Sequence, residues 1–283
     1  MGHAGRAVLA EPSGTGLDLS RVPGPLEQLD AARNWYFESL DAVGDDGWQR
    51  ASRCQGWTAG DVVAHVAGGD YLVRSAILDA TGRDRSLLAA VPADLGQSAQ
   101  WARLITVSDP KSLREVAHRE SQQTIAALRE VLQQAPQTKL RMPYGETPVT
   151  NALAIRTAEY VIHGYDLQPA SGRFVAAPAW FIDATLPRGA QGMWRTHALS
   201  PHKGKSASFH LHRTDGEGEW TLRAENGQGR SEPGHESADV MFRGSGAGLY
   251  WLLMGRGSPQ DLGLEIHGDP ALAAAFKEWF PGP

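Results

Sequence analysis

The sequence predicts an α+β protein in which an N-terminal four-helix bundle is followed by a smaller α+β domain. Apolar residues recur at helical spacing up to about residue 170, whereas beyond residue 200 they alternate with polar residues around glycine-rich turns. A chain of 283 residues is long enough for two domains. The hydrophobic share of 41% and the charged share of 21% are close to those of folded proteins, which excludes wholesale disorder.

Two segments with clear end signals predict the first two helices. The first begins after Pro25, continues through PLEQLDAARNWYFESLDAV and stops at the turn GDDG. The second is TAGDVVAHVAGGDYLVRSAILDATG, in which Thr58 and Asp61 resemble a capping pair and Gly82 lies beyond the end. Residues 1–22 are rich in Gly, Ala and Ser and lack periodicity, so we expect them to form a disordered arm.

The third helix is predicted to follow a loop that contains Pro92. Asp109 and Pro110 supply an N-cap and a first-turn proline for a helix that extends to about Gln134. The next segment, PQTKLRMPYGETP, reads as a long, turn-rich connection.

The fourth helix is expected from about Val149 to Leu167, where Pro169 ends it. Four helices joined by loops predict a bundle over residues 23–170. Residues 171–283 are then expected to form a connecting helix, APAWFIDATLPRGAQGMW, and the α+β domain. That domain contains a hairpin in SASFHLHRTDGEGEWTLRAE, strands in ADVMFRG and LGLEIHG, and helices in SGAGLYWLLMGR and DPALAAAFKEWF.

Charge and cysteine content exclude several classes of function. A net charge of −5 and a pI near 6.1 do not favour binding to nucleic acid. Cys54 is the only cysteine, so no intramolecular disulfide and no cysteine-based zinc site is expected. The first residues lack a signal-peptide core, and no segment offers about 18 continuous apolar residues. We therefore expect a cytoplasmic protein that does not interact with membranes; the sequence carries no indication of its oligomeric state.

The segment RTAEYVIHGYD contains a candidate metal site. Glu159 and His163 stand four residues apart on a predicted buried helix, so their side chains lie on the same face. His65, in DVVAHVAGG on the second helix, is a further candidate. If it faces inward, two histidines and one carboxylate form an open catalytic zinc site or another divalent metal site. Alternatively, His65 donates to a backbone carbonyl and Glu159 pairs with Arg156.

The segments SRCQGWTAGDVVAHVAGGDYLV and RTAEYVIHGYDL resemble the two signature helices of the mycothiol-dependent maleylpyruvate isomerase family, a branch of the DinB-like metal-binding four-helix bundles. The resemblance implies that His65, Glu159 and His163 bind a divalent metal, usually taken to be zinc. ADVMFRGSGAGLYWLLMGR and LEIHGDPALAAAF are similar to the second domain of that family, which resembles the sterol-carrier-protein fold. The family resemblance also implies mycothiol or a similar thiol as cofactor and an electrophilic small molecule as substrate.

Further residues are candidates for the site, each with a structural alternative. Asp166 is either an acceptor that fixes the tautomer of His163 or a polar group near a helix end. Trp57 either lines the pocket or packs the turn before the second helix. Arg156 binds a substrate carboxylate or forms a helix ion pair. Arg256 either reaches an anionic substrate or thiol cofactor across the domain interface or stabilises a helix C-terminus. Cys54 is expected to be a structural thiol.

The leading functional hypothesis is a metal-dependent and thiol-dependent isomerase or S-transferase that acts through a metal-bound thiolate. One alternative is thiol conjugation or exchange in natural-product biosynthesis or detoxification. Another is a non-catalytic small-molecule-binding protein with a structural metal. A fourth protein ligand at the metal would favour the latter.

Overall fold

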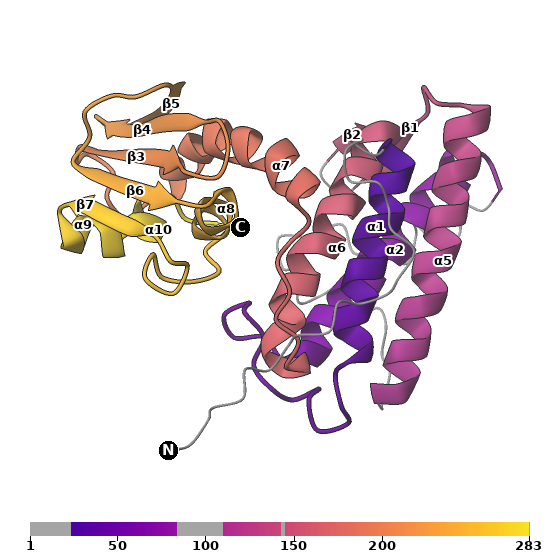
Figure 1. Ribbon diagram of the computed structural model, residues 1–283. Helices are drawn as coiled ribbons and strands as arrows, with labels where there is room; N and C mark the ends of the chain where they lie inside the picture. Colours follow the sequence, from indigo (N-terminus) through magenta and orange to yellow (C-terminus); the bar gives the residue numbers. More distant parts are fainter. Residues whose placement is uncertain (1–23, 84–109, 143–144, 283) are drawn as a thin grey trace, which may run out of the picture.

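Four long helices form the N-terminal part of the computed structural model, which describes residues 24–83, 110–142 and 145–282 (Figure 1). α1 packs against α6, and α2 packs against both α5 and α6, so the helices share one apolar core. The expected arm at residues 1–22, the loop with Pro92 and the Asp109 cap lie outside the described residues. The helices are α1 (Pro25–Asp41), α2 (Ala59–Ala80), α5 (Pro110–Gln134) and α6 (Val149–Ser171).

The predicted end signals of α2 are confirmed. The Thr58 hydroxyl accepts a hydrogen bond from the Asp61 N–H at 3.2 Å, while the Asp61 carboxylate accepts one from the Thr58 N–H at 2.9 Å. Gly82 follows the helix in the left-handed conformation with φ of 71°. The cap fixes where α2 begins, and therefore which face of the helix carries His65.

The connection between α5 and α6 contains regular structure that the sequence analysis did not predict. Strands β1 (Lys139–Met142) and β2 (Gly145–Pro148) pair antiparallel. The sequence analysis expected only a turn-rich connection here, and the structure adds this short ladder to it. Leu140 and Met142 are buried and alternate with exposed residues, which is the period of a strand with one buried face. Four residues are too few for that alternation to be distinguished from a loop by sequence.

α6 does not end at Pro169, as the sequence analysis expected. The proline lies inside the helix, which continues to Ser171. A proline this close to the C-terminus removes one backbone hydrogen bond and leaves only two further helical residues to disturb. The end is set instead by Gly172, which is left-handed with φ of 68° and donates its N–H to the Gln168 carbonyl at 2.9 Å.

A five-stranded mixed sheet is the centre of the C-terminal part. Its strand order is β5-β4-β3-β6-β7; β3 and β6 pair in parallel, and the other neighbours pair antiparallel. The expected hairpin and the two further expected strands are confirmed. β5 was not predicted, because its sequence QGRSEP is polar and shows no apolar alternation. The strands are β3 (Ala207–Arg213), β4 (Glu219–Glu225), β5 (Gln228–Pro233), β6 (Val240–Gly244) and β7 (Glu265–Gly268).

Helices and an aromatic core accompany this sheet. Phe209 of β3 and Phe242 of β6 both contact Phe276, and Phe209 also contacts Phe280, with ring centroids 5.3–5.6 Å apart. The expected connecting helix is confirmed as α7, which leads from the bundle to the sheet (Figure 1). These elements are α7 (Ala179–Gly192), the 3₁₀ helix η1 (Met193–Leu199), α8 (Gly246–Leu253), α9 (Pro270–Ala274) and α10 (Phe276–Trp279).

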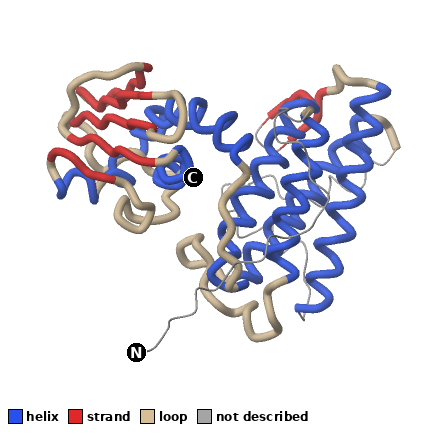
Figure 2. The backbone as a smooth tube through the Cα atoms, viewed as in Figure 1, coloured by secondary structure: helices blue, strands red, loops and turns tan. Residues whose placement is uncertain are grey.

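The fold class is confirmed as α+β, with a helical N-terminal domain and a sheet in the C-terminal domain. Figure 2 shows the strands of that sheet gathered together, apart from the small β1–β2 ladder beside the helices. The expected domain boundaries at residues 22 and 170 stay predictions. Among the described residues, no helix combines the length and the apolar character needed to cross a membrane.

The two domains meet at α6 and α8. Tyr165 of α6 stacks on Trp251 of α8, with ring centroids 3.9 Å apart and planes 4° from parallel. The guanidinium of Arg53 lies over the same Tyr165 ring, with its carbon 4.3 Å from the centroid. This contact places the segment that follows α8 next to the face of α6 that carries His163.

The close approach of α1 to α6 generates a stability prediction. A Cβ atom on Gly164 would lie 2.5 Å from a Trp35 ring carbon and 3.1 Å from the Tyr36 Cα. We expect Gly164→Ala to lower the free energy of unfolding by about 1–2 kcal/mol, because overpacking outweighs the gain in helix propensity. Urea unfolding would measure it. Gly189→Ala is the matched control: its Cβ would lie 3.5 Å from a Leu253 methyl, so the protein should keep or gain stability. Equal gains in both variants would contradict the close packing of α1 on α6.

Candidate metal centre

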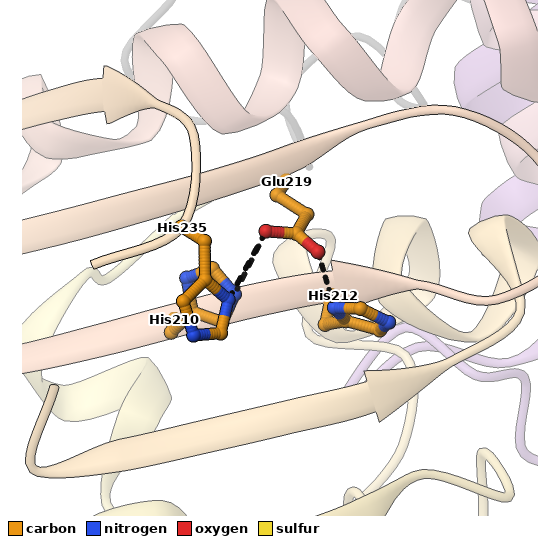
Figure 3. A group of neighbouring side chains, drawn as sticks. All are labelled: His210, His212, Glu219 and His235. Atoms are coloured by element: carbon orange, nitrogen blue, oxygen red, sulfur yellow. Dashed lines mark hydrogen bonds and ion pairs between the residues drawn. The ribbon is translucent and has the colours of Figure 1, made fainter. Parts of the chain in front are cut away.

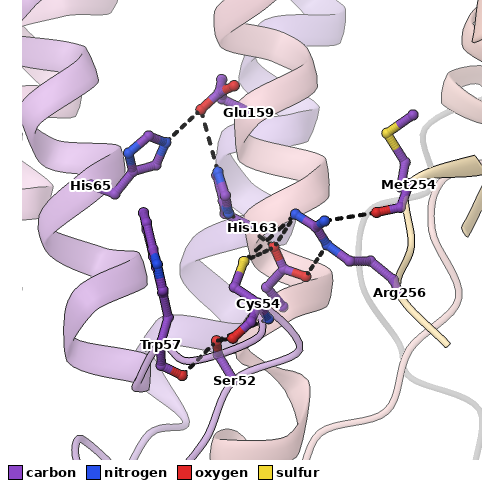
Figure 4. Close-up of polar contacts among 9 residues, drawn as sticks. Ser52, Cys54, Trp57, His65, Glu159, His163, Met254 and Arg256 are labelled. Carbon is purple, nitrogen blue, oxygen red and sulfur yellow. Dashed lines mark hydrogen bonds and ion pairs between the residues drawn. The ribbon is translucent and has the colours of Figure 1, made fainter. Parts of the chain in front are cut away.

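Two helices bring His65, Glu159 and His163 to one point (Figure 4). His65 comes from α2, and the other two residues come from α6. The Glu159 Oε2 atom lies 3.2 Å from the His65 Nε2 atom and 3.4 Å from the His163 Nε2 atom. The two imidazole centroids are 4.8 Å apart. Two imidazole nitrogens and one carboxylate oxygen therefore face a common centre.

The structural alternative for these residues does not describe the observed contacts. His65 directs its Nε2 atom at Glu159 and not at a backbone carbonyl. Arg156 lies on another face of α6, where its Nε atom is 3.2 Å from the Asp70 Oδ1 atom and an Nη atom donates to the Val66 carbonyl. Arg156 is 3% exposed, and Asp70 is 1% exposed. Arg156 thus ties α6 to α2 inside the bundle, and Glu159 is left to the two histidines.

Asp166 fixes the orientation of His163. The His163 Nδ1 atom lies 3.0 Å from the Asp166 Oδ2 atom, and Asp166 is fully buried. A hydrogen bond from Nδ1–H to this carboxylate leaves the Nε2 lone pair directed at Glu159. The Cys54 thiol also donates to Asp166 Oδ2, at 3.0 Å, and the Arg256 Nε–H donates to Oδ1 at 2.9 Å. Asp166 therefore links the site to the C-terminal domain.

The protonation of these groups indicates a site that requires a positive charge. Burial alone would raise the pKa of Glu159, but the hydrogen bonds from His163 and His65 hold it well below its ordinary value. Burial would lower the pKa of His163, yet its hydrogen bonds to Asp166, Cys54 and Glu159 raise it well above 6.5. Because the His163 Nδ1–H donates to Asp166, the His163 Nε2 lone pair and the Glu159 oxygen are two acceptors that face each other. A proton or a metal cation must lie between them.

The donor set fits a divalent metal. Imidazole nitrogen and carboxylate oxygen are ligands of zinc and of other first-row divalent ions. In the part of the chain that the structure describes, no fourth His, Cys, Asp or Glu joins this group of three. Cys54 belongs instead to a group with His163 and Asp166, on the Nδ1 side of the imidazole.

A cavity of about 620 Å³ opens beside the three residues, at the junction of the two domains. Trp57 lines it, with its ring centroid 5.3 Å from that of His65, and so do Cys54 and Arg256. Arg156 and Asp166 are not among the lining residues, so neither is placed to contact a ligand in this cavity. Figure 4 shows Arg256 reaching from the C-terminal domain toward Cys54 and His163.

Two cations of this cavity were missed by the sequence analysis. Arg53 and Lys277 line it together with Arg256, and among the described lining residues Glu159 is the only acidic one. Burial and the charge of Arg256 lower the pKa of Lys277 to about 8. In sequence, Lys277 lies in the segment DPALAAAFKEWF, where no motif indicates its position. The cavity therefore has a cationic wall that only the tertiary structure reveals.

A second cavity, of about 670 Å³, lies where α1, α6 and α7 meet. Its walls are mostly apolar and include Leu26, Leu153, Trp180 and Phe181. Among the described residues, no group of three metal-capable side chains belongs to it. The smaller cavity at the domain junction is therefore the better candidate for chemistry.

Comparisons with known proteins agree on one family. The family model of the mycothiol maleylpyruvate isomerase N-terminal domain matches residues 29–168, and that of the C-terminal domain of the same family matches residues 175–275. Two solved structures, of the mycothiol-dependent maleylpyruvate isomerase and of a point mutant of it, are similar in fold with TM-scores of 0.60 and 0.61. Each is 20% identical and covers 83% of this chain and 89% of its own. No curated protein matches.

The pKa shifts predict how pH affects the metal-free protein. Glu159 has a lowered pKa, so it stabilises the fold at pH values above 4.5, which is its ordinary pKa. This contribution is lost as the pH falls through the pKa of the folded state. His163 has a raised pKa, so its contribution to stability is complete below pH 6.5, which is its ordinary pKa. This contribution is lost as the pH rises toward and through the pKa of the folded state. Thermal unfolding of chelator-treated protein should therefore show decreasing stability above pH 6.5.

The variant His163→Gln should flatten this decrease, because the titrating group is gone while a polar side chain remains. His267→Ala removes an exposed histidine that pairs with Glu265 at 3.7 Å, and it serves as the control with an unchanged slope. The assignment would be wrong if the wild-type protein and His163→Gln lost stability equally between pH 6.5 and 9.

Proposed function

Because the chain belongs to the mycothiol maleylpyruvate isomerase family, we propose that it is a thiol-dependent enzyme that isomerises an electrophilic small molecule or transfers a thiol to it. The observation that carries the proposal is the convergence of His65, Glu159 and His163 beside a cavity with a cationic wall. Mycothiol, named in the matching family, is the proposed thiol.

His65, Glu159 and His163 are the proposed ligands of a divalent metal, for which zinc fits the donors best. When bound, such a metal supplies Lewis acidity, which favours the thiolate form of a thiol at neutral pH. Three protein donors leave room for a small ligand, as in catalytic zinc sites. This count supports the enzyme over the alternative of a binding protein with a structural metal.

Asp166 is proposed as a positioning residue. It holds the His163 ring through Nδ1 and the Arg256 side chain through Nε, and it is itself out of contact with the cavity. Arg256 is additionally held by the Met254 carbonyl, at 2.7 Å from an Nη atom. The guanidinium is therefore fixed before a substrate arrives, which reduces the entropy cost of binding an anion.

Arg256, Lys277 and Arg53 are proposed to bind an anionic substrate. Among the described lining residues, three cations and one acidic side chain favour a ligand with one or more carboxylates. With a pKa of about 8, Lys277 is mostly protonated at neutral pH. Trp57 supplies an apolar wall beside His65, where an unsaturated carbon chain can lie.

The wall also suits the chemistry of thiol addition. Cis/trans isomerisation requires sulfur to bond to the electrophilic carbon, the former double bond to rotate, and the carbon–sulfur bond to break again. Negative charge moves onto the conjugated carbonyl oxygen after the addition and returns when sulfur leaves, so no net proton is consumed. Cations that are already oriented in the wall stabilise that charge. If the carbon–sulfur bond persists and the carbon is protonated, the outcome is S-transfer.

Metal analysis tests the ligand assignment. We expect His65→Ala, Glu159→Ala and His163→Ala each to lose one equivalent of divalent metal per chain relative to the wild type, because removing any one donor leaves only two. His118→Ala is the matched control: it deletes a surface histidine that pairs with Asp41 at 2.9 Å, and it should retain the metal. Wild-type metal content in all three site variants would remove the basis for this centre.

Thiol binding tests the mechanism. Mycothiol added to cobalt-substituted protein should produce a sulfur-to-metal charge-transfer band and release a proton, because the ligand is the thiolate. An electrophilic unsaturated acid should be converted only when thiol and metal are both present. If neither mycothiol nor other cellular thiols changed the cobalt spectrum, the thiol mechanism would have to be abandoned.

In the same assay, Arg256→Ala should raise KM for an anionic substrate about 10- to 100-fold while the metal stays bound, because a charge-assisted contact is lost. Arg256→Lys keeps the charge but not the fork that Asp166 holds, so its effect should be smaller.

A further inference from the structure

A second group of metal-capable side chains lies in the C-terminal domain, on the sheet (Figure 3). His210 and His212 are two residues apart on β3, so they point to the same face. Glu219 of β4 is the register partner of His212 and therefore shares that face. His235, from the segment between β5 and β6, completes the group. The opposite face of β3 carries Phe209 and Leu211, which are buried in the core.

The backbone brings His235 to this position. Gly234 adopts φ of 107°, a conformation that turns the chain sharply after β5. Its N–H donates to the Glu219 carbonyl at 2.9 Å, so the residue before His235 is anchored to the residue that carries the carboxylate. The His235 ring then lies beside that of His210, with centroids 4.6 Å apart.

The polar atoms of the four side chains converge. The Glu219 carboxylate lies 2.5 Å from His212 Nδ1, 3.2 Å from His235 Nδ1 and 3.6 Å from His210 Nε2. All four donor atoms lie within 4.8 Å of one another. A tetrahedral ion with bonds of about 2.0–2.1 Å needs donors roughly 3.3 Å apart, so small side-chain movements would close the set around one ion.

His210 supplies the observation that points to a ligand. Its side chain is 2% exposed, and its Nε2 atom has no hydrogen-bond partner among the described residues. Its Nδ1 atom lies 3.1 Å from the Thr221 hydroxyl, which can accept the Nδ1–H bond and leave the Nε2 lone pair aimed into the group. A buried lone pair without a partner is costly unless a cation occupies the site.

We propose that His210, His212, Glu219 and His235 form a second metal site, which holds Zn²⁺ or another late first-row divalent ion in the C-terminal domain. Three imidazoles are borderline donors that favour such ions over Mg²⁺ or Ca²⁺, and zinc also accepts a carboxylate ligand. Four protein donors close the coordination shell, as in structural zinc sites. The ion would fasten the segment between β5 and β6 to the β3–β4 hairpin.

The graded exposure of the donors fits this role. His210 lies at the buried end, His212 and Glu219 are about one quarter exposed, and the His235 side chain is 67% exposed. An ion can therefore enter from solvent, and His235 can close over it as the last ligand. Because three donors come from the hairpin, the site is largely prepared before His235 arrives.

The experiment uses untagged, full-length protein in the His65→Ala background, which removes the candidate ligand on α2. After chelation, Co²⁺ is titrated and its visible ligand-field absorption is followed. We expect one equivalent per chain to bind with the spectrum of a tetrahedral nitrogen and oxygen site. Adding His235→Ala, a change at an exposed loop residue, should weaken Co²⁺ binding at least tenfold, because losing a direct ligand costs no less than losing a supporting contact. Adding His212→Ala should do the same.

His267→Ala is the matched control in that background, because His267 is an exposed histidine of the same sheet whose ion-pair partner among the described residues is Glu265. It should leave the titration unchanged. Absence of Co²⁺ binding in the His65→Ala protein would overturn the proposal. So would a binding curve that His212→Ala and His235→Ala leave unchanged, or one that His267→Ala weakens equally, because the ion would then bind to surface histidines without preference.

Discussion

The candidate site depends on one buried carboxylate, that of Asp166. It accepts hydrogen bonds from His163 and Cys54 of the N-terminal domain and from Arg256 of the C-terminal domain. A carboxylate without exposed surface is stable only when such partners offset the loss of hydration. Burial acts to raise the pKa of Asp166, but His163 and Arg256 hold it below its ordinary value, so the group stays ionised. The same charge therefore fixes an imidazole tautomer, orients a guanidinium at the cavity and joins the two domains.

The neighbours of Asp166 on α6 show how one helical turn serves four purposes. Successive residues of a helix point about 100° apart, so His163, Gly164, Tyr165 and Asp166 face different surroundings. His163 faces Glu159 and His65, Gly164 admits the Trp35 ring of α1, and Tyr165 stacks on Trp251 of α8. Moving α6 along or about its axis would disturb the bundle packing, the domain junction and the site together. The position of the site is thus a consequence of packing and does not rest on the three proposed ligands alone.

Local signals explain which features the sequence could predict. The Thr58 cap and the four-residue spacing of Glu159 and His163 involve neighbours in sequence, so both were predicted correctly as structure. Pro169 was misjudged because its effect depends on how much helix remains after it. β5 was missed because it pairs with β4 through its backbone and carries no apolar pattern that would mark it as a strand. The partner of Arg156 and the placement of Lys277 in the cavity depend on chain segments far apart in sequence. No periodicity or motif contains that information, which arises only when these distant segments pack together.

The two histidine groups follow one rule in two types of secondary structure. On α6, side chains four residues apart share a face, whereas on β3 the interval is two residues, so EYVIH and HLH are equivalent ways to direct donors at one point. In each group, a hydrogen-bond acceptor faces the Nδ1 atom of a buried imidazole, Asp166 for His163 and Thr221 for His210, and this frees Nε2. They differ in the number of donors and in the space beside them. Three donors next to a cavity suit a catalytic metal site, whereas four donors that include a loop residue suit a structural metal site. A divalent ion would therefore serve different purposes in the two domains, although the donor chemistry is nearly the same.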